Sequence, residues 1–492
     1  MLKDSEKKIP SYVIEEMVNY LYSHGIVMKN TEGKGVIHIP SVIYPSPIVK
    51  SFFEKIEFYQ IAFNKIFDKL SRDQQFLEEI LTPLSESNEF IKKNLEISKK
   101  ANEFPQKQKI QLNIFRNDFM VDKIKKFIYQ TEFNTIAVTM GTFSDEMKRF
   151  FSFFSKKYPE YFERFLNKND REVPIEKADS ISTFVDSIIE GIKLFNENYK
   201  ETLIVFVVQE NEKNIFDQRS IENDLWNRFN VKSRRLTLNE IAKNCEYDEN
   251  KNLKIDNKII SLFYFRSCYT EKDFVDEESW KGREMIELST AIKVPNINSF
   301  LTTFKVFQYY LTKPDILKKF CPEELISNDI IRFFMKIYYV RDMTPEAQKE
   351  LFAKITENLN DFVVKPQKEG GANNYYGEQI KSLIPEGENE PNDELKNSII
   401  MEKINPPEYE TMVLKNDELV LQKVVSEFSV YGVILSDDAK YYLNKSVGFL
   451  VRTKDANQNE GGIMTGVAAV DIPFLIDMPV NREDESVIEY TF

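Results

Sequence analysis

Glycine is scarce in this 492-residue chain, and nearly half of it lies in two short segments. The chain has 15 glycines, about 3% of its residues where roughly 7% is usual. Seven of them are Gly370, Gly371 and Gly377 in one segment and Gly448, Gly461, Gly462 and Gly466 in the other. Glycine leaves the backbone bare and reaches positive φ without strain. The distribution therefore predicts two loops whose backbone must turn sharply or approach a ligand closely.

Histidine and cysteine counts exclude several kinds of chemistry. His24 and His38 are the only histidines, so a Ser-His-Asp triad, a histidine-ligated zinc site or a histidine general base would have to draw on two residues 14 apart. Cys245, Cys268 and Cys321 show no C-x-x-C spacing, which indicates neither a disulfide framework nor a thiolate metal cluster. We expect a reducing compartment, the cytoplasm, for such a chain.

Charge and hydropathy limit the partners. The 66 basic and 79 acidic residues give a net charge of −13, which argues against general nucleic-acid binding. The longest apolar runs, such as 203–208, are far shorter than the ~20 residues of a membrane span. The first residues show no apolar signal core. We therefore expect neither nucleic acid nor membrane as a partner.

Hydrophobic periodicity predicts a mixed α/β chain. Apolar residues recur three and four apart over 51–70 and 145–166, which is typical of amphipathic helices, and 127–138 has the composition of a strand. Short buried strands at 201–209 and 258–265 flank a helical stretch at 220–229, which suggests an α/β unit. Strands are predicted at 361–366, 398–404, 419–435 and 447–454, with a solvated loop or flap at 386–396.

The first glycine segment follows an apolar strand. Lys365 ends the strand, Glu369 follows, and Gly370 and Gly371 come next. Bare backbone can approach phosphate oxygens, a lysine supplies a point charge, and a carboxylate can hold Mg²⁺. The P-loop pattern is absent, so a nucleotide site would be of another type. An ordinary hairpin turn remains the alternative from composition alone.

Two further patterns place polar pairs on single strand faces. Arg452 and Lys454 are two residues apart before the second glycine segment, so both project from one face. Glu132 and Asn134 have the same spacing and could supply two oxygen ligands to Mg²⁺. A solvated edge strand is the alternative for the first pair, and strands carry pairs like the second routinely. Together these patterns suit charge neutralisation of a phosphoryl group, which needs no histidine.

At these residues the sequence resembles the eukaryotic glutathione synthetases of the ATP-grasp superfamily. The resemblance rests on FRNDFM (115–120), TEFNTI (131–136), NIFDQRSIEND (214–224), KPQKEGGANNYYG (365–377), IMEKI (400–404) and LVRTK…EGGIMTGVA (450–468). These motifs occur in the family's order over nearly the whole chain. The resemblance implies an α/β ATP-grasp fold with an inserted small parallel α/β substrate domain and a flexible lid.

The implied domains are an N-terminal part of the ATP-grasp core with helical elements (1–200), the inserted domain (202–304), and a C-terminal part with the lid and glycine loops (305–492). The implied reaction joins γ-glutamylcysteine to glycine through an acyl phosphate, with ATP and Mg²⁺, in a homodimer. Catalytic roles are implied for Arg116, Lys305, Lys365 and Arg452, and metal ligation for Glu132, Asn134 and Glu369.

The remaining roles are carried over from the resemblance. Nucleotide contacts are implied for Lys305, Lys365, Gly370, Gly371, Asn374, Tyr376, Met401, Glu402, Ile404, Glu427, Lys454 and Glu460. Substrate contacts are implied for Arg116, Thr139, Glu212, Asn214, Gln218, Arg266, Tyr269, Arg452, Ile463 and Met464.

Departures from the family pattern gather at three places. Ala372 replaces a loop glycine, and Ser267-Cys268 replaces an Asp-Gly pair between Arg266 and Tyr269. Ile463-Met464-Thr465 replaces a small Val-Ala-Ala in the loop that bears on the acceptor amino acid. Three hypotheses follow: a glutathione synthetase, a ligase with another acceptor such as β-alanine, serine or a larger amine, or a non-catalytic binding relative. We expect Cys268 to be packed rather than reactive.

Overall fold

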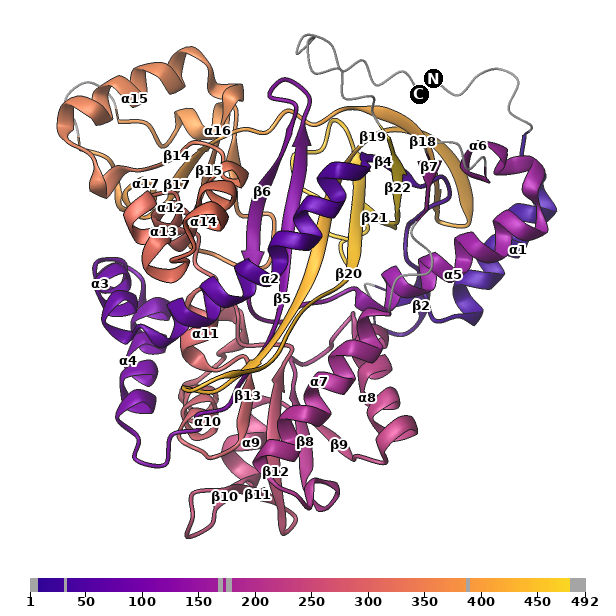
Figure 1. Cartoon of the computed structure of the whole chain (residues 1–492). Coiled ribbons are helices and arrows are strands. Elements are labelled where there is room, and N and C mark those ends of the chain that lie inside the picture. The colour runs from indigo at the N-terminus through magenta and orange to yellow at the C-terminus, as the bar shows by residue number, and fades with distance from the viewer. Residues whose placement is uncertain (1–7, 31–32, 167–170, 174–178, 386–389, 478–492) are drawn as a thin grey trace.

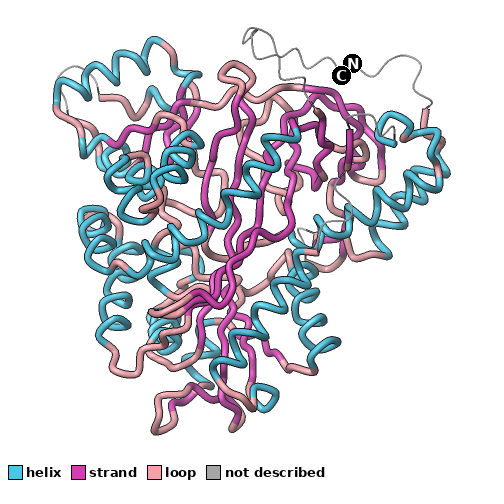
Figure 2. Tube along the Cα trace, in the orientation of Figure 1, coloured by secondary structure: helices cyan, strands magenta, loops and turns pink. Residues whose placement is uncertain are grey.

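The computed structural model describes residues 8–30, 33–166, 171–173, 179–385 and 390–477. Strands run through the middle of the molecule and helices flank them (Figure 2). Within the described part of the chain, no helix is both long and apolar enough to span a bilayer.

A seven-stranded sheet forms the centre (Figure 1). Its order is β18 (Tyr409–Lys415), β3 (Ser41–Val42), β21 (Ala468–Asp471), β20 (Tyr441–Asp455), β19 (Glu418–Ser436), β5 (Gln111–Asp122) and β6 (Phe127–Asn134). All neighbours are antiparallel except β21 and β3. Because β18 also pairs with β19, this end of the sheet curls back on itself.

Helix α2 (Lys50–Arg72) crosses one face of the central sheet (Figure 1). Phe67 stacks on Phe133 of β6 with ring centroids 3.7 Å apart, and Phe63 contacts Phe119 of β5. Side chains alternate between the faces of a strand. Phe115 of β5 and Phe133 of β6 therefore face α2, whereas the next residues along these strands, Arg116 and Asn134, face the other way.

The N-terminal region surrounds this sheet with helices and two small sheets. The helices are α1 (Ser11–Ser23), α3 (Gln74–Ser85), α4 (Glu89–Glu103), α5 (Gly141–Lys157) and α6 (Glu163–Leu166). The small sheets are β1 (Val27–Lys29) with β2 (Val36–His38), and β4 (Ser46–Val49), β22 (Pro473–Ile476) and β7 (Arg171–Glu172).

A mainly parallel sheet forms at the bottom of Figure 1. Its order is β10 (Glu246–Tyr247), β11 (Leu253–Ile255), β12 (Lys258–Phe265), β8 (Leu203–Val207) and β9 (Ser233–Leu236), with β13 (Ile292–Val294) also on β12. Its helices are α7 (Ser180–Phe195), α8 (Ile215–Phe229), α9 (Leu238–Asn244), α10 (Glu277–Glu287) and α11 (Ile297–Leu301). The strands predicted at 201–209 and 258–265 are confirmed as β8 and β12.

A four-stranded antiparallel sheet forms a third unit with its own apolar core. Its order is β14 (Ile337–Tyr339), β17 (Ile399–Glu402), β15 (Phe362–Lys365) and β16 (Tyr375–Tyr376). Its helices are α12 (Val306–Leu311), α13 (Pro314–Phe320), α14 (Glu324–Ile330), α15 (Pro345–Glu357), α16 (Glu378–Lys381) and α17 (Asp393–Asn397).

Several predicted elements have different bounds in the structure. Strand β20 begins at Tyr441, six residues before the predicted strand 447–454, and α8 begins at Ile215, five residues before the predicted helical stretch 220–229. The prediction of a single helix over 145–166 is wrong, because α5 ends at Lys157. Pro159 follows, and a proline disfavours helical backbone at the residue before it. The strand predicted over 127–138 ends at Asn134, since Ala137 has φ of 50°. In the predicted loop 386–396, residues 386–389 lie outside the described residues, and Asp393 begins α17.

Candidate active site

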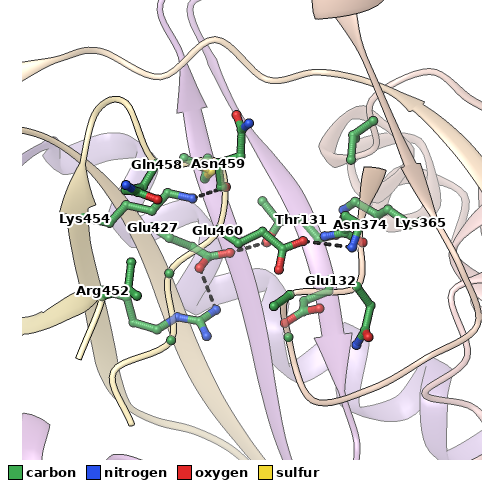
Figure 3. A pocket seen from close by; sticks show the side chains of 18 of the residues that line it. Thr131, Glu132, Lys365, Asn374, Glu427, Arg452, Lys454, Gln458, Asn459 and Glu460 are labelled. Carbon is green, nitrogen blue, oxygen red and sulfur yellow. Dashed lines mark hydrogen bonds and ion pairs between the residues drawn. The ribbon is translucent and has the colours of Figure 1, made fainter. Parts of the chain in front are cut away.

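A cavity of about 590 Å³ lies where the three large sheets approach one another. The central sheet contributes β5, β6, β19 and β20 to its wall, and the four-stranded sheet contributes β15, β16 and β17. Tyr269 reaches it from the segment that follows β12. Figure 3 shows charged side chains from these separate strands pointing into the same space.

Strand register brings the predicted polar pairs onto one face of the central sheet. Arg116 lies opposite Asn134 in the β5–β6 ladder, and Glu427 lies opposite Arg452 in the β19–β20 ladder. Lys454 is two residues beyond Arg452, so both project from the same face. The predictions that Glu132 and Asn134, and Arg452 and Lys454, share strand faces are confirmed.

Glu132, Asn134 and Glu369 offer oxygens to a divalent cation. Burial raises the pKa of the Glu132 carboxyl, and the nearby Asp118 and Glu369 charges raise it further, so a cation would relieve this repulsion. Among the described residues, no cluster of three His, Cys, Asp or Glu side chains forms a metal centre alone. Mg²⁺ typically takes one or two protein carboxylates and completes its shell with substrate phosphates and waters. The residues present therefore fit Mg²⁺ held together with a nucleotide.

Two buried lysines line the cavity. Lys305 Nζ lies 2.9 Å from Glu369 Oε1 and donates to the Lys368 carbonyl. Burial opposes its charge, but Glu369 and Glu132 outweigh burial and raise its pKa. Lys365 Nζ donates to the Thr131 carbonyl at 2.8 Å. Burial lowers the pKa of Lys365 to about 8, and a bound polyanion would favour its charged form.

The first glycine loop lines the cavity in left-handed backbone. Gly370, Gly371 and Ala372 have φ of 97°, 70° and 57°. Ala372 therefore occupies a conformation that an L-residue adopts at a cost. The Asn374 N–H donates to Glu460 at 2.9 Å, which joins this loop to the second one (Figure 3).

The second glycine loop needs its glycine for close approach. A Cβ added at Gly461 would lie 2.9 Å from Cδ of Lys454. Ile463 is buried, and Met464 and Thr465 line the cavity. Thr465 Oγ1 donates to the Gly462 carbonyl at 2.8 Å, so its hydroxyl is used within the loop.

The predicted nucleotide strand presents alternate residues to the cavity. Met401 and Ile404 line it, but Glu402 does not. The Glu402 carboxylate pairs with Lys125 at 3.2 Å and Lys354 at 3.1 Å instead. The Glu402 side chain therefore faces away from this cavity, because successive residues of a strand face opposite ways. The nucleotide contact implied for Glu402 stays a prediction.

Four predicted substrate residues lie outside the cavity wall: Glu212, Asn214, Gln218 and Arg266. Arg266 is buried and pairs with Asp217 at 3.0 Å. Asp217 in turn accepts the N–H of Met140, which does line the cavity. Arg266 thus lies behind the wall in this conformation, with Nε and Nη1 lacking a hydrogen-bond partner among the described residues.

The other three of these residues bond within the protein. Glu212 accepts the Asn214 N–H at 2.7 Å, and Gln218 accepts from Arg235 at 2.6 Å. None of the four side chains lines the cavity in this conformation. A sequence motif does not indicate on which side of a loop a residue lies, so the substrate contacts implied for these residues stay predictions.

The remaining predicted residues do line the cavity. They are Arg116, Glu132, Asn134, Thr139, Tyr269, Lys305, Lys365, Glu369, Gly370, Gly371, Asn374, Tyr376, Met401, Ile404, Glu427, Arg452, Lys454, Glu460, Ile463 and Met464.

Sequence reasoning missed two buried acids, Asp118 and Asp217. Asp118 is fully buried on β5, two residues from Arg116, so the alternation of strand faces could have placed it at the site. Burial opposes its ionisation, but the charges of Arg116 and Arg452 hold its pKa far below the ordinary value. Asp217 had no such signal, since its partners are distant in sequence.

Cysteine and histidine take no part in the cavity wall. Cys268 is fully buried, and burial raises its thiol pKa to about 12, so the expectation of a packed thiol is confirmed. All three cysteines are free. His24 stacks on Tyr20, and His38 Nε2 accepts the Asp417 N–H.

Comparison with known proteins agrees with this geometry. Residues 7–475 match the family model described as eukaryotic glutathione synthase, ATP binding domain. The glutathione synthetase of Dictyostelium discoideum is 31% identical over 489 residues, covering 94% of this chain and 98% of that protein. The glutathione synthetase of Xenopus laevis is 30% identical over 460 residues, covering 92% and 94%.

A solved structure shares the fold. The apo form of a glutathione synthetase-like effector from Globodera pallida superposes with a TM-score of 0.74 at 17% identity, covering 96% of this chain and 99% of that one. The mixed α/β architecture is the ATP-grasp fold expected from the sequence. On the match over residues 7–475 and the identity to full-length relatives, this chain belongs to the eukaryotic glutathione synthase family.

Proposed function

We propose that this protein is an ATP- and Mg²⁺-dependent ligase that joins γ-glutamylcysteine to glycine. One observation supports this most strongly: the three predicted lysines, two arginines, an acid–amide pair and two glycine loops line a single cavity. Family membership and relatives named glutathione synthetase favour glycine over another acceptor.

The chemistry has two steps. An oxygen of the cysteinyl carboxylate attacks the γ-phosphorus of ATP, the bond to the bridging oxygen breaks, and ADP leaves. The resulting acyl phosphate is attacked at its carbonyl carbon by the glycine amine. The amide bond forms, inorganic phosphate leaves with the former carboxylate oxygen, and the amine loses a proton to water. Neither step requires a covalent enzyme intermediate.

Charge on the cavity wall suits the phosphoryl step. Lys305 and Lys365 are positioned to neutralise transferring phosphoryl oxygens, and the backbone N–H groups of Gly370 and Gly371 can donate to them. Glu132, Asn134 and Glu369 would hold Mg²⁺, which when bound supplies further neutralisation of phosphate charge.

Arg452 is suited to the carboxylate that becomes activated. Its guanidinium offers a planar donor pair to a carboxylate or an acyl phosphate, which a lysine cannot match. Its present partners are Glu427 at 2.6 Å and Asp118 at 2.8 Å. Closure of the glycine loops would exclude water, because an acyl phosphate hydrolyses readily.

A product assay tests this function and its two alternatives. Purified full-length protein receives Mg-ATP, γ-glutamylcysteine and glycine, β-alanine or serine, and ADP release and product mass are followed. Glycine-dependent ADP release with the tripeptide mass is expected. Far greater stimulation by another acceptor would favour a different ligase, and no release with any acceptor would favour a binding relative.

Two buried lysines make a matched pair of variants. Burial lowers the pKa of both Lys365 and Lys293 to about 8, but Lys293 lies outside this cavity and donates to Ser289. Lys365→Met is expected to abolish ADP release, while Lys293→Met retains it. Equal rates for the two variants would contradict the assignment of Lys365.

We also propose that the protein is a homodimer and that it is located in the cytoplasm. The dimer is supported by the family resemblance and by exposed apolar residues Val36 and Ile37 on β2, at 46% and 39% exposure. Three free buried cysteines are compatible with a reducing compartment. Light scattering is expected to give twice 57.9 kDa, and a value of 57.9 kDa would contradict the dimer.

A further inference from the structure

Asp118 is the carboxylate on which two arginines and one predicted metal ligand of the cavity converge. It is fully buried on β5. Arg116 Nε donates to Oδ1 and Arg116 Nη2 donates to Oδ2, both at 2.8 Å. Arg452 Nη2 donates to Oδ2 at 2.8 Å, and Asn134 Nδ2 donates to Oδ2 at 2.9 Å. Four donors from three strands thus meet at one side chain that lies behind the cavity wall.

Asp118 holds two like charges together. Arg116 lies on β5 and Arg452 on β20, with β19 between these strands. Two guanidinium groups directed at one space repel each other unless an anion lies between them. The two-point contact with Arg116 fixes the plane of that guanidinium, and the bond to Arg452 fixes the second relative to the first.

Asp118 also sets the orientation of the Asn134 side chain. An amide group has a donor end and an acceptor end. Because Nδ2 donates to Asp118, which accepts but cannot donate when ionised, the Oδ1 end is the one left for a cation. Glu132, the other strand-borne oxygen ligand, lies directly opposite Asp118 in the β5–β6 ladder.

We propose that Asp118 is a positioning residue that acts on two ligands at once: it orients Arg116 and Arg452 toward the anionic peptide substrate and Asn134 Oδ1 toward the divalent cation. This inference rests on the proposed function for the identity of the peptide. It predicts that one substitution weakens two binding events whose contact residues lie on different strands.

Asp118→Asn is the sharpest change, since it conserves shape and removes charge. The new amide NH₂ would face the donors of Arg116, Arg452 or Asn134, and its single oxygen cannot accept from all of them. The arginines then reorient toward Glu132 and Glu427, which already lie 3.8 Å and 2.6 Å from them. Asn134 would lose the contact that fixes its amide.

Asp68→Asn provides a matched control. Asp68 is a buried aspartate on α2 that pairs with Arg72 at 3.2 Å and accepts from Ser436 at 2.7 Å. It does not line the cavity. A loss that reflects only the removal of a buried ion pair would therefore appear in both variants.

Two binding measurements on the full chain carry the test. Calorimetry measures the affinity for γ-glutamylcysteine, and electron paramagnetic resonance measures the affinity for Mn²⁺ in the presence of ADP. In Asp118→Asn both affinities are expected to fall by roughly 10- to 100-fold, the range found when a partner of a metal ligand is removed. In Asp68→Asn both are expected to stay within twofold of wild type. An unchanged value for either ligand in Asp118→Asn, or equal losses in the two variants, would overturn the inference.

A charge-conserving variant guards against loss of folding. Asp118→Glu keeps the anion and displaces it by one methylene group, and both affinities are expected to fall at least threefold. Wild-type values for either ligand would overturn the inference. Wild-type protein that binds neither γ-glutamylcysteine nor Mn²⁺ with ADP would instead refute the proposed function, so the two failures are distinguishable.

Discussion

Lys305 and Glu369 form an ion pair at 2.9 Å across the entrance to the first glycine loop. Lys305 is predicted to contact phosphate, and Glu369 is predicted to bind the metal. In the absence of nucleotide and metal, the two side chains neutralise each other's charge. Both side chains are largely buried, which makes an unpaired charge costly there. On the proposed function, binding of a metal–nucleotide complex would exchange this contact for two new ones without leaving either charge uncompensated.

Glu369→Ala is expected to abolish turnover through the metal rather than through folding. We expect ADP release to fall at least 10³-fold, with no recovery at high Mg²⁺, because a ligand and the counter-charge of Lys305 are both lost. Thermal unfolding, monitored by circular dichroism, should shift by only a few degrees.

The control is Glu284→Ala, which removes another glutamate–lysine pair. Glu284 Oε2 lies 2.6 Å from Lys100 Nζ, and neither residue lines the cavity. This variant should retain wild-type turnover. An undiminished rate for Glu369→Ala at saturating Mg²⁺ would show that Glu369 does not belong to the site.

Ala372→Gly is expected to stabilise the protein. Ala372 has φ of 57°, and relief of a left-handed alanine is worth about 1 kcal/mol. Gly371→Ala makes the opposite change at the neighbouring position, where φ is 70° and an added Cβ meets no atom within 4 Å.

Chemical denaturation measures both variants. The free energy of unfolding should rise for Ala372→Gly and fall for Gly371→Ala by a similar amount, since only backbone conformation differs. Changes of the same sign would show that the loop does not keep these backbone angles in solution.

Asp471 is expected to make stability fall with rising pH. Burial raises its pKa to about 7, against hydrogen bonds from Ser46, Thr453 and the Ile472 N–H. The ordinary value, which applies to the unfolded chain, is about 3.9. Between these two values the folded protein binds more protons than the unfolded chain, so its stability declines by up to ~1.4 kcal/mol per pH unit. Above pH 7 this contribution becomes constant.

Asp471→Asn removes that titration. Urea unfolding at pH 5, 6, 7 and 8 should show the stability of the variant rising relative to wild type up to pH 7 and levelling after it. Parallel curves for the two proteins would refute the raised pKa of Asp471.

The double variant Met464→Ala with Thr465→Ala is expected to shift acceptor preference toward glycine. Both residues line the cavity, and the family pattern has small residues there. The measurement is kcat/KM for glycine divided by kcat/KM for β-alanine and for serine. We expect each ratio to rise at least threefold, and an unchanged ranking would count against a role of this loop in acceptor choice.

The local hydrophobic pattern of the sequence was sufficient to predict many of the helices and strands. The strands β8, β12, β15, β17 and β19 and the helix α2 were predicted close to their observed bounds, because each has a strong period or a continuous apolar run. Errors fell where one residue overrides the pattern. Pro159 ends α5, Ala137 turns the chain after β6, and Asp393 begins a helix in a polar segment.

Some residues of the site could be predicted from strand alternation, and other contacts could not. Residue pairs on one strand, such as Glu132 with Asn134, were predictable because alternation fixes the face. The same alternation places the side chains of Met401 and Glu402 on opposite faces of β17. The pairing of Arg266 with Asp217 and that of Asp118 with Arg452 required the tertiary structure, since the members of each pair are distant in sequence.

Transfer of a labelled oxygen tests the central claim most directly. γ-Glutamylcysteine carrying ¹⁸O in both oxygens of its cysteinyl carboxylate is converted with Mg-ATP and glycine, and the inorganic phosphate is analysed by mass spectrometry. An acyl phosphate mechanism predicts one ¹⁸O atom in each phosphate released, with the other retained in the new amide. Unlabelled phosphate, or no phosphate at all, would contradict carboxylate activation in this cavity.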